Sequence, residues 1–286
     1  LRRGHETSPL SKEAARLLAL AFGIPVAGPY IDQEGCYMSA TAAFKCPLQC
    51  SLGTAWVGNF VLPPGTRGQS PSQLLLPEPS GNGHLVVQPL YAGNTSWDWA
   101  LTAFVDHDLE RALAQSARIF SKQVLPPQGT VGIPWCDQQN PVNPEAHGAG
   151  VFVGANTHTT PYDFVRATAS GLVFELFRMF ESAKQCGAMD GIVLGGGASK
   201  GACFRRLVAA MFHPLPVLWQ KDYDLAAARG VVMPLCPEAA RGAFVPVTAE
   251  NVPLGALWES YKMYLETFER LFGCNPELRP FRCRGR

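Results

Sequence analysis

A short apolar strand that runs directly into three consecutive glycines, and then into a helix, constrains the fold of this chain most. Ile192–Leu194 is the apolar run, Gly195–Gly197 follows without a linker, and apolar residues at helical spacing continue to Met211. This order is typical of α/β proteins, in which helices cover a sheet. The glycines let a ligand approach the backbone, and the amino end of the next helix offers free N–H groups. The bend therefore predicts either a ligand site or a tight turn without one.

The spacing of the glycines in this bend excludes two common nucleotide motifs. Gly195, Gly197 and Gly201 form the pattern G-x-G-x-x-x-G, which is not the dinucleotide-binding pattern G-x-G-x-x-G. Gly201 is followed by Ala202, whereas a phosphate-binding P-loop requires Lys at that place. A nucleotide at this bend would therefore be held in another way.

The rest of the chain shows a hairpin first and then alternating helices and strands, which indicates an α/β lobe. Two segments rich in Pro and Gly, residues 63–83 and 125–150, are predicted as loops. One predicted helix begins after Ser11 as its N-cap, and the segment from Trp97 to Phe120 is predicted to be mostly helical. The other predicted helices are Thr160 to about Cys186, Phe204–Met211, Leu225–Val232 and Leu254–Phe272. The predicted strands are a buried Ile24–Val26, a hairpin of Ala42–Leu52 and Trp56–Leu62, residues 85–91, Gly191–Leu194 and Val217–Trp219.

Composition and charge exclude several classes of protein. The 286 residues suffice for one large domain or two modest ones, and 47% hydrophobic with 16% charged residues excludes a disordered chain. A formal net charge of +1 gives no electrostatic reason to bind nucleic acid or an anionic membrane. The richest apolar stretch, Leu17–Val26, is too short to span a bilayer and contains Gly23 and Pro25. We therefore expect a soluble globular protein.

The cysteines favour a cytoplasmic location. There are 9, an odd number at irregular spacings, which fits reduced thiols better than a set of disulfides. Cys46 and Cys50 have C-x3-C spacing, but no second pair completes a zinc site, so no metal-binding residues are predicted. The chain begins with Leu1 and enters helical sequence at once, from which we expect that coding sequence lies upstream.

Two further features could carry chemistry, and each has a simpler reading. Ser51–Thr54 is a turn of small residues that could offer backbone N–H groups and a hydroxyl to a phosphate, or could simply close a hairpin. Asp32 follows a predicted strand, where α/β proteins present side chains to a cleft. It could act as a general base or could be a solvated or capping carboxylate.

Taken in order, five segments resemble the carboxy-terminal lobe of the FGGY family of carbohydrate kinases. Five matches in one order are far more specific than any one motif. The segments are Gly23–Val26 leading to Asp32-Gln33, Ser51–Trp56, Gly150–Gly154 with Asp163–Ala167, Ile192–Ala198 and Leu225–Val231.

This resemblance implies a fold and a division into domains. The fold would be an α/β ATPase lobe of the actin/hexokinase-like (ribonuclease H-like) type, a mixed sheet flanked by helices. Residues 1–42 would be the tail of the amino-terminal FGGY lobe, and residues 43–286 the carboxy-terminal, ATP-binding lobe. Members of that family are nearly twice as long as this chain, and their amino-terminal lobe carries a D-x-G-T phosphate loop. Nothing in this sequence resembles that loop, so the resemblance implies a partial chain that lacks this partner lobe.

The resemblance also implies ATP-dependent phosphorylation of a sugar or polyol hydroxyl, closest to the xylulokinase branch. Asp32 would be the catalytic base that accepts the hydroxyl proton, and Gly53 and Thr54 would bind the ATP phosphates. Mg²⁺ would bridge phosphate oxygens, with one positioning carboxylate expected from the absent lobe. The adenosine would be bound by Gly195, Gly196, Gly197, Ala198 and Gly201.

A different class of function stays open beside the kinase. The chain could be a non-catalytic ATP-binding regulatory module descended from a sugar kinase. The sequence does not name the sugar or polyol, and it leaves the oligomeric state open, a homodimer included. An acetate-type kinase or an ATPase of the same fold has no supporting residue.

Overall fold

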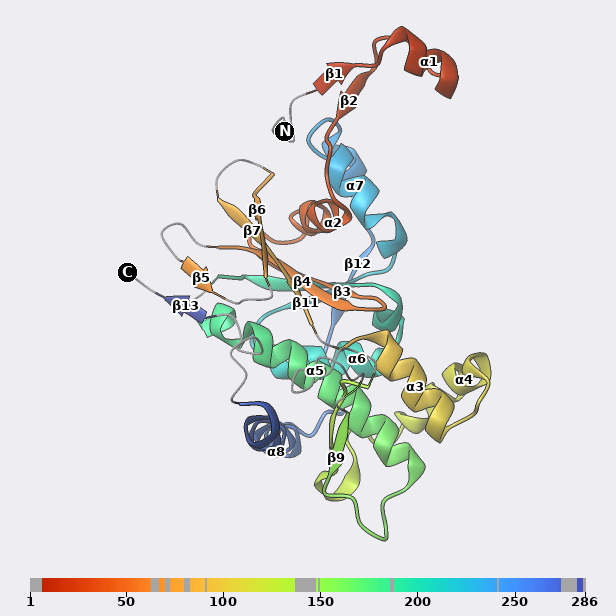
Figure 1. The fold of residues 1–286 in the computed structure, drawn as a ribbon, viewed down its shortest axis with the longest axis vertical. Helices are drawn as coiled ribbons and strands as arrows, with labels where there is room; N and C mark the ends of the chain where they lie inside the picture. Colours follow the sequence, from red (N-terminus) through yellow and green to blue (C-terminus); the bar gives the residue numbers. More distant parts are fainter. Residues whose placement is uncertain are drawn as a thin grey trace.

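A seven-stranded mixed sheet forms the centre of the protein, shown as a computed structural model in Figure 1. The strand order is β12-β11-β10-β3-β4-β7-β6. Strands β3, β10 and β11 are parallel to one another, and the other neighbours are antiparallel. The strands are β3 (Pro47–Leu52), β4 (Trp56–Val61), β6 (Leu74–Pro77), β7 (His84–Pro89), β10 (Gly191–Gly195), β11 (Val217–Gln220) and β12 (Phe244–Val247).

The structure describes residues 7–62, 67–69, 73–79, 83–90, 92–136, 148, 150–185, 188–240, 242–273 and 282–284. Within these ranges, no helix has both the length and the apolar character that crossing a membrane would require.

Helices cover both faces of the sheet. In Figure 1, α2 and α7 lie on one face, and α5 and α6 lie on the other, with α8 beyond α5. The helices α3 and α4 lie at one end of α5. The bounds are α1 (Lys12–Leu18), α2 (Asp32–Ala40), α3 (Asn94–Phe104), α4 (Leu109–Ile119), α5 (Pro161–Gln185), α6 (Ala202–Phe212), α7 (Ala226–Val232) and α8 (Leu254–Phe272).

Short elements complete the fold. Three two-stranded sheets pair β1 (Thr7–Pro9) with β2 (Pro25–Ala27), β8 (Val131–Ile133) with β9 (Val151–Val153), and β5 (Arg67–Gln69) with β13 (Arg282–Arg284). Four 3₁₀ turns are η1 (Pro127–Gly129), η2 (Gly197–Lys200), η3 (Tyr223–Leu225) and η4 (Pro237–Ala240).

Apolar and polar side chains alternate along β3, so that the two faces of the sheet differ in character. Leu48, Cys50 and Leu52 are buried in the main core, whereas Gln49 lies between them in sequence and is bonded to polar groups. The amide of Asn59 on β4 donates to Gln49 and, at 2.7 Å, to Gln33 of α2. Because successive strand residues point to opposite faces, the apolar set meets α5 and α6 and the amides meet α2.

Backbone contact joins α2 to α7 on this polar face. A Cβ on Gly35 would lie 2.5 Å from the carbonyl oxygen of Ala227, and a Cβ on Gly230 would overlap the carbonyl of Gly35. Any side chain at either position would force the helices apart. Glycine at both positions therefore sets how closely the two helices pack.

A buried ion pair fixes α8 against α5 on the opposite face. Arg178 donates to both carboxylate oxygens of Glu175, at 2.7 and 2.6 Å, and both side chains are buried. The hydroxyl of Tyr264 donates to the same carboxylate at 2.8 Å, and the guanidinium lies 3.9 Å from the ring centre of Phe268. The paired and hydrogen-bonded charges are thereby compensated within the core.

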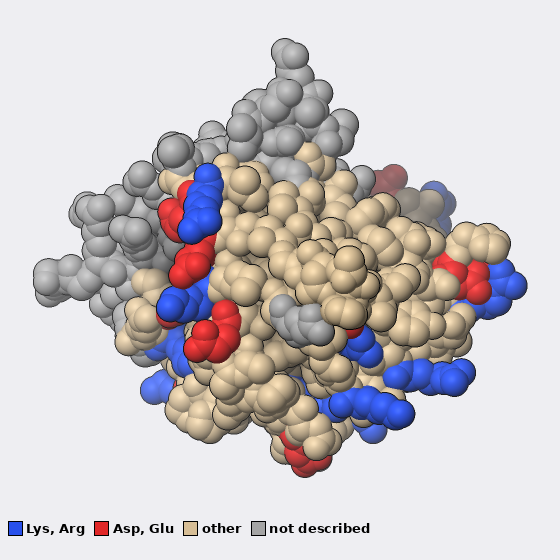
Figure 2. Space-filling model, turned by 90° about the horizontal axis from the view of Figure 1, so that it is seen from below, with Lys and Arg blue, Asp and Glu red and all other residues tan. Residues whose placement is uncertain are grey.

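The face seen from the side of α8 is uncharged over most of its centre, with Lys, Arg, Asp and Glu gathered toward its rim (Figure 2). This distribution agrees with the low charged fraction of the sequence. The view offers no continuous basic surface across that centre of the kind that nucleic-acid-binding proteins use.

The fold confirms the predicted hairpin, although its first strand begins at Pro47 and not at Ala42. It also confirms the strand before the glycine bend and the long helices that begin after Thr160 and at Leu254. The cap at Ser11 is confirmed, because its hydroxyl accepts from the Ala14 N–H at 3.2 Å. The predicted end of α5 at Cys186 and parts of both predicted loops lie outside the described residues.

The structure corrects some predictions. The segment around Ile24–Val26 is a strand, but it is exposed and not buried, since it pairs only with β1 in the projecting β1–α1–β2 unit. Strands β5, β6 and β8 lie within the two segments that were expected to be loops. Helix α2 and strand β12 were not predicted, because neither has a clear apolar period.

The prediction that Trp97 to Phe120 is mostly helical is confirmed. The segment forms two helices, α3 and α4, which are separated where Asp106 and Asp108 bond to nearby backbone N–H groups.

Candidate functional site

The two glycine-bearing bends lie side by side at one edge of the central sheet. Strands β3 and β10 are parallel neighbours, with Gly195 in register with Ser51. The bend Gly195–Gly197 follows β10, and the turn Gly53–Thr54 follows β3. Because both strands end at the same edge, two segments about 140 residues apart in sequence meet there. In open α/β sheets, this edge at the carboxyl ends of the strands is where ligands bind.

Gly196 makes the contact between the bends. Its φ is +85°, in the region that favours glycine, and a Cβ there would lie 2.6 Å from both N and C of Leu52. Conformation and space both exclude a side chain at this position. The close approach of the two backbones therefore depends on this residue.

Asn94, the first residue of α3, joins the same edge. Its backbone N–H donates to the Gly53 carbonyl at 3.1 Å, and its Nδ2 donates to the Leu52 carbonyl at 3.3 Å. Its Oδ1 accepts from the indole N–H of Trp56 at 3.0 Å. These bonds hold the turn after β3 against the start of α3. Asn94 was not predicted as a site residue, and its place directly after Gly93 was the available signal.

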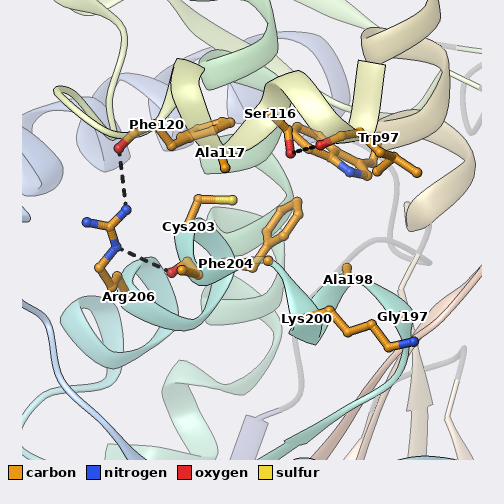
Figure 3. Close-up of a pocket in the computed structure, with 13 residues that line it drawn as sticks. Trp97, Ser116, Ala117, Phe120, Gly197, Ala198, Lys200, Cys203, Phe204 and Arg206 are labelled. Carbon is orange, nitrogen blue, oxygen red and sulfur yellow. Dashed lines mark hydrogen bonds between the residues drawn. The ribbon is translucent and has the colours of Figure 1, made fainter. Parts of the chain in front are cut away.

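A cavity of about 480 Å³ opens beside the bend, between α4 and the start of α6 (Figure 3). The Trp97 side chain of α3 lies at one end of it and Arg206 at the other. Of the residues predicted to bind adenosine, Gly197, Ala198 and Gly201 line this cavity. The remaining lining residues are Leu113, Ser116, Ala117, Phe120, Lys200, Ala202, Cys203 and Phe204.

Aromatic and aliphatic walls with few polar groups give this cavity the character of a small-molecule site. At its polar side, the Nζ of Lys200 lies 5.5 Å from the ring centre of Tyr223, whose hydroxyl raises the pKa of that lysine. The Cys203 thiol faces the cavity as a neutral group, because burial raises its pKa to about 12. The cavity can therefore accept a flat apolar group with a cation at its edge.

Two arginines hold the carboxyl end of α4, which forms one wall of the cavity. Arg166 of α5 donates to the carbonyl of Ile119 at 2.7 Å and to that of Gln123 at 3.2 Å. Arg206 donates to the carbonyl of Phe120 at 3.4 Å (Figure 3). The last carbonyls of a helix lack partners within it, so cationic donors are favourable there.

Asp163 in turn holds Arg166. Its Oδ1 accepts from Arg166 Nη1 at 2.8 Å, and its Oδ2 accepts from the N–H and the hydroxyl of Thr160, both at 2.8 Å. Asp163 and Arg166 are both buried or nearly so. The Asp163 carboxylate thus ties Thr160 to the first turn of α5 and orients the arginine as well.

Asp32 is not bonded to either of the two bends among the described residues. It is the first residue of α2 and is exposed, and its Oδ1 accepts from the N–H of Gln33 at 2.8 Å. The structure thus brings together Gly53, Thr54 and the glycine bend, and leaves the predicted base on the α2 face, solvent-exposed.

Metal-binding groups do not gather at this site. Within the described ranges, no cluster of three or more His, Cys, Asp or Glu side chains could hold a metal ion. A Mg²⁺ ion needs several oxygen ligands. The described residues therefore do not form a magnesium cage by themselves.

The fold and the paired bends define a class of protein: an α/β lobe of the actin/hexokinase-like type, with a mixed sheet flanked by helices. The sequence profile of the FGGY family of carbohydrate kinases, C-terminal domain, matches residues 64–236. The chain therefore belongs to the FGGY family of carbohydrate kinases.

Solved structures show the same fold at low sequence identity. Xylulose kinase from Rhodospirillum rubrum matches with a TM-score of 0.75 and 16% identity, over 95% of this chain and 57% of that one. Gluconate kinase from Lactobacillus acidophilus matches with a TM-score of 0.75 and 16% identity, over 96% and 57%. Plasmodium falciparum glycerol kinase with ADP matches with a TM-score of 0.64 and 14% identity, over 94% and 56%.

The chain thus spans a little more than half the length of these solved kinases. A comparison with curated proteins gave no match.

Proposed function

We propose that this chain is the ATP-binding lobe of a sugar or polyol kinase. The observation that carries the proposal is the meeting of the Gly53–Thr54 turn with the Gly195–Gly197 bend, next to a cavity of about 480 Å³. Phosphoryl transfer depends mainly on positioning and charge stabilisation, and paired backbone bends supply both. The kinase family of the chain supports the same reaction.

In this proposal the cavity holds the adenosine of ATP. Gly197, Ala198 and Gly201 line it, and its volume lies in the range of small-molecule sites. Gly195 and Gly196 lie at the adjoining end of β10 and would guide the nucleotide toward the sheet edge. The adenine ring would lie between the α4 wall of the cavity and the side chain of Phe204. Lys200 would face the phosphates.

The turn after β3 would hold the phosphate that is transferred. Gly53 leaves its backbone open, since a Cβ there would meet only the Ala55 carbonyl, at 3.7 Å. Thr54 is exposed and can donate from both its N–H and its hydroxyl. Such donors stabilise charge that develops on phosphate oxygens.

Asp32 would be the general base that accepts the proton of the attacking hydroxyl. Its exposure leaves both carboxylate oxygens accessible to a substrate held against the α2 face. Proton acceptance by a positioned carboxylate accelerates such reactions by about 10²- to 10⁴-fold. The sugar or polyol would lie between Asp32 and the phosphate turn.

The whole enzyme would contain a further lobe and Mg²⁺. The solved kinases continue well beyond the matched region, and the described residues here lack a magnesium cage. We therefore place the metal-positioning carboxylates in an amino-terminal lobe, with residues 1–42 as its tail and residues 43–286 as the carboxy-terminal lobe. A bound Mg²⁺ would neutralise phosphate charge.

We also propose a cytoplasmic location, because free thiols persist in a reducing compartment. Within the described part of the chain, Cys36, Cys46, Cys50, Cys203 and Cys236 are free thiols.

Nucleotide binding and turnover, measured separately, test this function. Calorimetry with ADP should show binding to residues 1–286. The same titration with buffer that contains no nucleotide is the control. The protein made from the complete reading frame should release ADP from ATP only when a sugar or polyol is added. Failure to bind ADP would contradict the proposal, and binding without turnover in the complete protein would assign a non-catalytic ATP-binding module instead.

A further inference from the structure

A buried serine of the η2 turn holds the carbonyl of the glycine bend that precedes it. Ser199 is fully buried, and its hydroxyl donates to the carbonyl oxygen of Gly196 at 2.6 Å. The backbone N–H of Ser199 donates to the same oxygen at 3.1 Å, which is the ordinary bond of a 3₁₀ turn. A carbonyl oxygen has two lone pairs, so the side chain and the backbone of one residue occupy both.

Two residues from other elements hold this serine. The indole N–H of Trp219 on β11 donates to the Ser199 hydroxyl at 3.1 Å. Because an indole N–H can only donate, the hydroxyl must accept there, and its single proton is left for Gly196. Arg205 of α6 donates to the carbonyls of Ser199 and Lys200, at 2.6 and 2.8 Å. Its guanidinium also lies 4.1 Å from the centre of the Trp219 ring, so β11 and α6 together fix the turn.

The bond to Gly196 sets the direction of the next backbone N–H. The Gly196–Gly197 peptide is trans, so its C=O and N–H lie in one plane and point in opposite directions. Since the carbonyl points to the buried serine, the N–H of Gly197 points away from it. Gly197 is exposed and lines the cavity of about 480 Å³. This N–H is therefore accessible to a group bound beside the cavity.

We propose that Ser199 is a positioning residue that directs the Gly197 N–H to the phosphate adjoining the bound adenosine, an inference that rests on the proposed function. Consecutive glycines have no side chains to restrict their peptides, so the bend alone permits several orientations. A Gly196–Gly197 peptide turned the other way would present its carbonyl oxygen to the phosphate and repel it. The Ser199 hydroxyl, oriented by Trp219, prevents that rotation.

Ligands with and without a phosphate test this role. Calorimetry compares ADP, AMP and adenosine on the wild-type residues 1–286 and on Ser199→Ala. We expect Ser199→Ala to raise the Kd of ADP and of AMP about tenfold, as loss of one hydrogen bond to a charged group would. The Kd of adenosine should stay the same, because the walls of the cavity are unchanged.

A second variant removes the partner of the serine instead. Trp219→Phe keeps an aromatic ring beside Arg205 and deletes only the N–H that orients the hydroxyl. It should raise the Kd of ADP and of AMP by about threefold, the effect of one neutral hydrogen bond, and leave that of adenosine unchanged. If Ser199→Ala does not fold, this variant decides the question with the same three ligands.

Ser39→Ala is the matched control. Ser39 of α2 is also fully buried, and its hydroxyl accepts from the side-chain amide of Gln220 at 3.0 Å. Gln220 follows Trp219 on β11, and successive strand residues point to opposite faces of the sheet. The control therefore deletes the same kind of bond to the same strand on the other face, and all three Kd values should equal those of the wild type.

A measurement without ligand separates the possible failures. The amide nitrogen chemical shift of Gly197 responds to hydrogen bonding at the Gly196 carbonyl, so it should change in Ser199→Ala and not in Ser39→Ala. A changed shift with unchanged Kd values would overturn the proposal, since the nucleotide would not use this N–H. Equal weakening of all three ligands would also overturn it, by giving Ser199 a purely structural role. No binding of ADP to the wild type would reject the proposed function, and this inference with it.

Discussion

The guanidinium of Arg166 reaches across from α5 to the end of α4, where its Nη2 donates to the carbonyl of Ile119 at 2.7 Å. Within α4 itself, only Ala112 and Ile119 are buried among the described residues. The position of this cavity wall therefore depends strongly on Arg166. The link joins the start of the helix after Thr160 to the proposed adenosine site.

Replacement of Arg166 should lower the affinity for nucleotide more than it lowers the stability of the folded protein. Hydrogen bonds to charged groups contribute about 1.5–3 kcal/mol, so we expect Arg166→Gln to raise the Kd for ADP about tenfold or more. Arg118→Gln, which changes an exposed arginine of α4 itself, is the control and should leave the Kd unchanged. Calorimetry measures both, and exchange of the α4 amides should rise in Arg166→Gln alone. An unchanged Kd with faster α4 exchange would show that the wall does not contact the nucleotide.

A methyl group at the contact between the bends should disrupt the site. Gly196→Ala would bring a Cβ to 2.6 Å from the Leu52 backbone at a φ of +85°, so the bends must move apart. We expect loss of measurable ADP binding and a lower melting temperature, because such strain costs about 1–3 kcal/mol. Gly255→Ala, whose Cβ would meet nothing within 4 Å, should bind ADP as the wild type does. Normal binding by Gly196→Ala would remove this bend from the nucleotide site.

The glycine bend was predictable because its chemistry is local. Three glycines between an apolar strand and a helix can be read without knowing what lies nearby, and so can the turn Gly53–Thr54. Their meeting follows from the parallel pairing of β3 with β10, which no local pattern encodes. The resemblance to FGGY kinases supplied that long-range order.

The parts of the site that could not be predicted depend on tertiary contacts. The roles of Asn94 and Arg166 come from carbonyls that only the folded chain brings within reach. The α2 helix was missed because its residues lack an apolar period, its stability coming from backbone contact with α7 at Gly35. Burial of Ile24–Val26 was wrongly expected, since apolar character alone does not show which surface is covered.

Removal of the proposed base should affect turnover and leave nucleotide binding intact. In the complete protein, Asp32→Asn should lower kcat by about 10²- to 10⁴-fold, because the amide cannot accept the hydroxyl proton. The Kd for ADP should stay the same, since no described bond joins Asp32 to the bends. Glu110→Gln, an exposed acid on α4, is the control for loss of one negative charge. Near-normal turnover in Asp32→Asn would exclude this residue as the base.

Alkylation should separate the cysteines by their surroundings. Burial raises the pKa of Cys203 to about 12, so at pH 8 only about one thiol in ten thousand is the reactive thiolate. Treatment of the native protein with iodoacetamide should therefore label exposed Cys46 and Cys236 and spare Cys203, as mass spectrometry of peptides would show. Labelling of Cys203 as fast as Cys236 would show that burial does not hold the Cys203 thiol in its neutral form.

The glycine contact between α2 and α7 has a mechanical consequence. With the Gly35 carbonyl pressed against Gly230, neither helix can slide without lifting the other, so the pair shifts as one rigid body. Asp32 begins α2, and α7 follows β11, which is the neighbour of β10, the strand before the glycine bend. Any motion that carries α7 toward the glycine bend would therefore also move the Asp32 carboxylate. If the proposed function holds, nucleotide binding at the bend would in this way be coupled to the position of the proposed base.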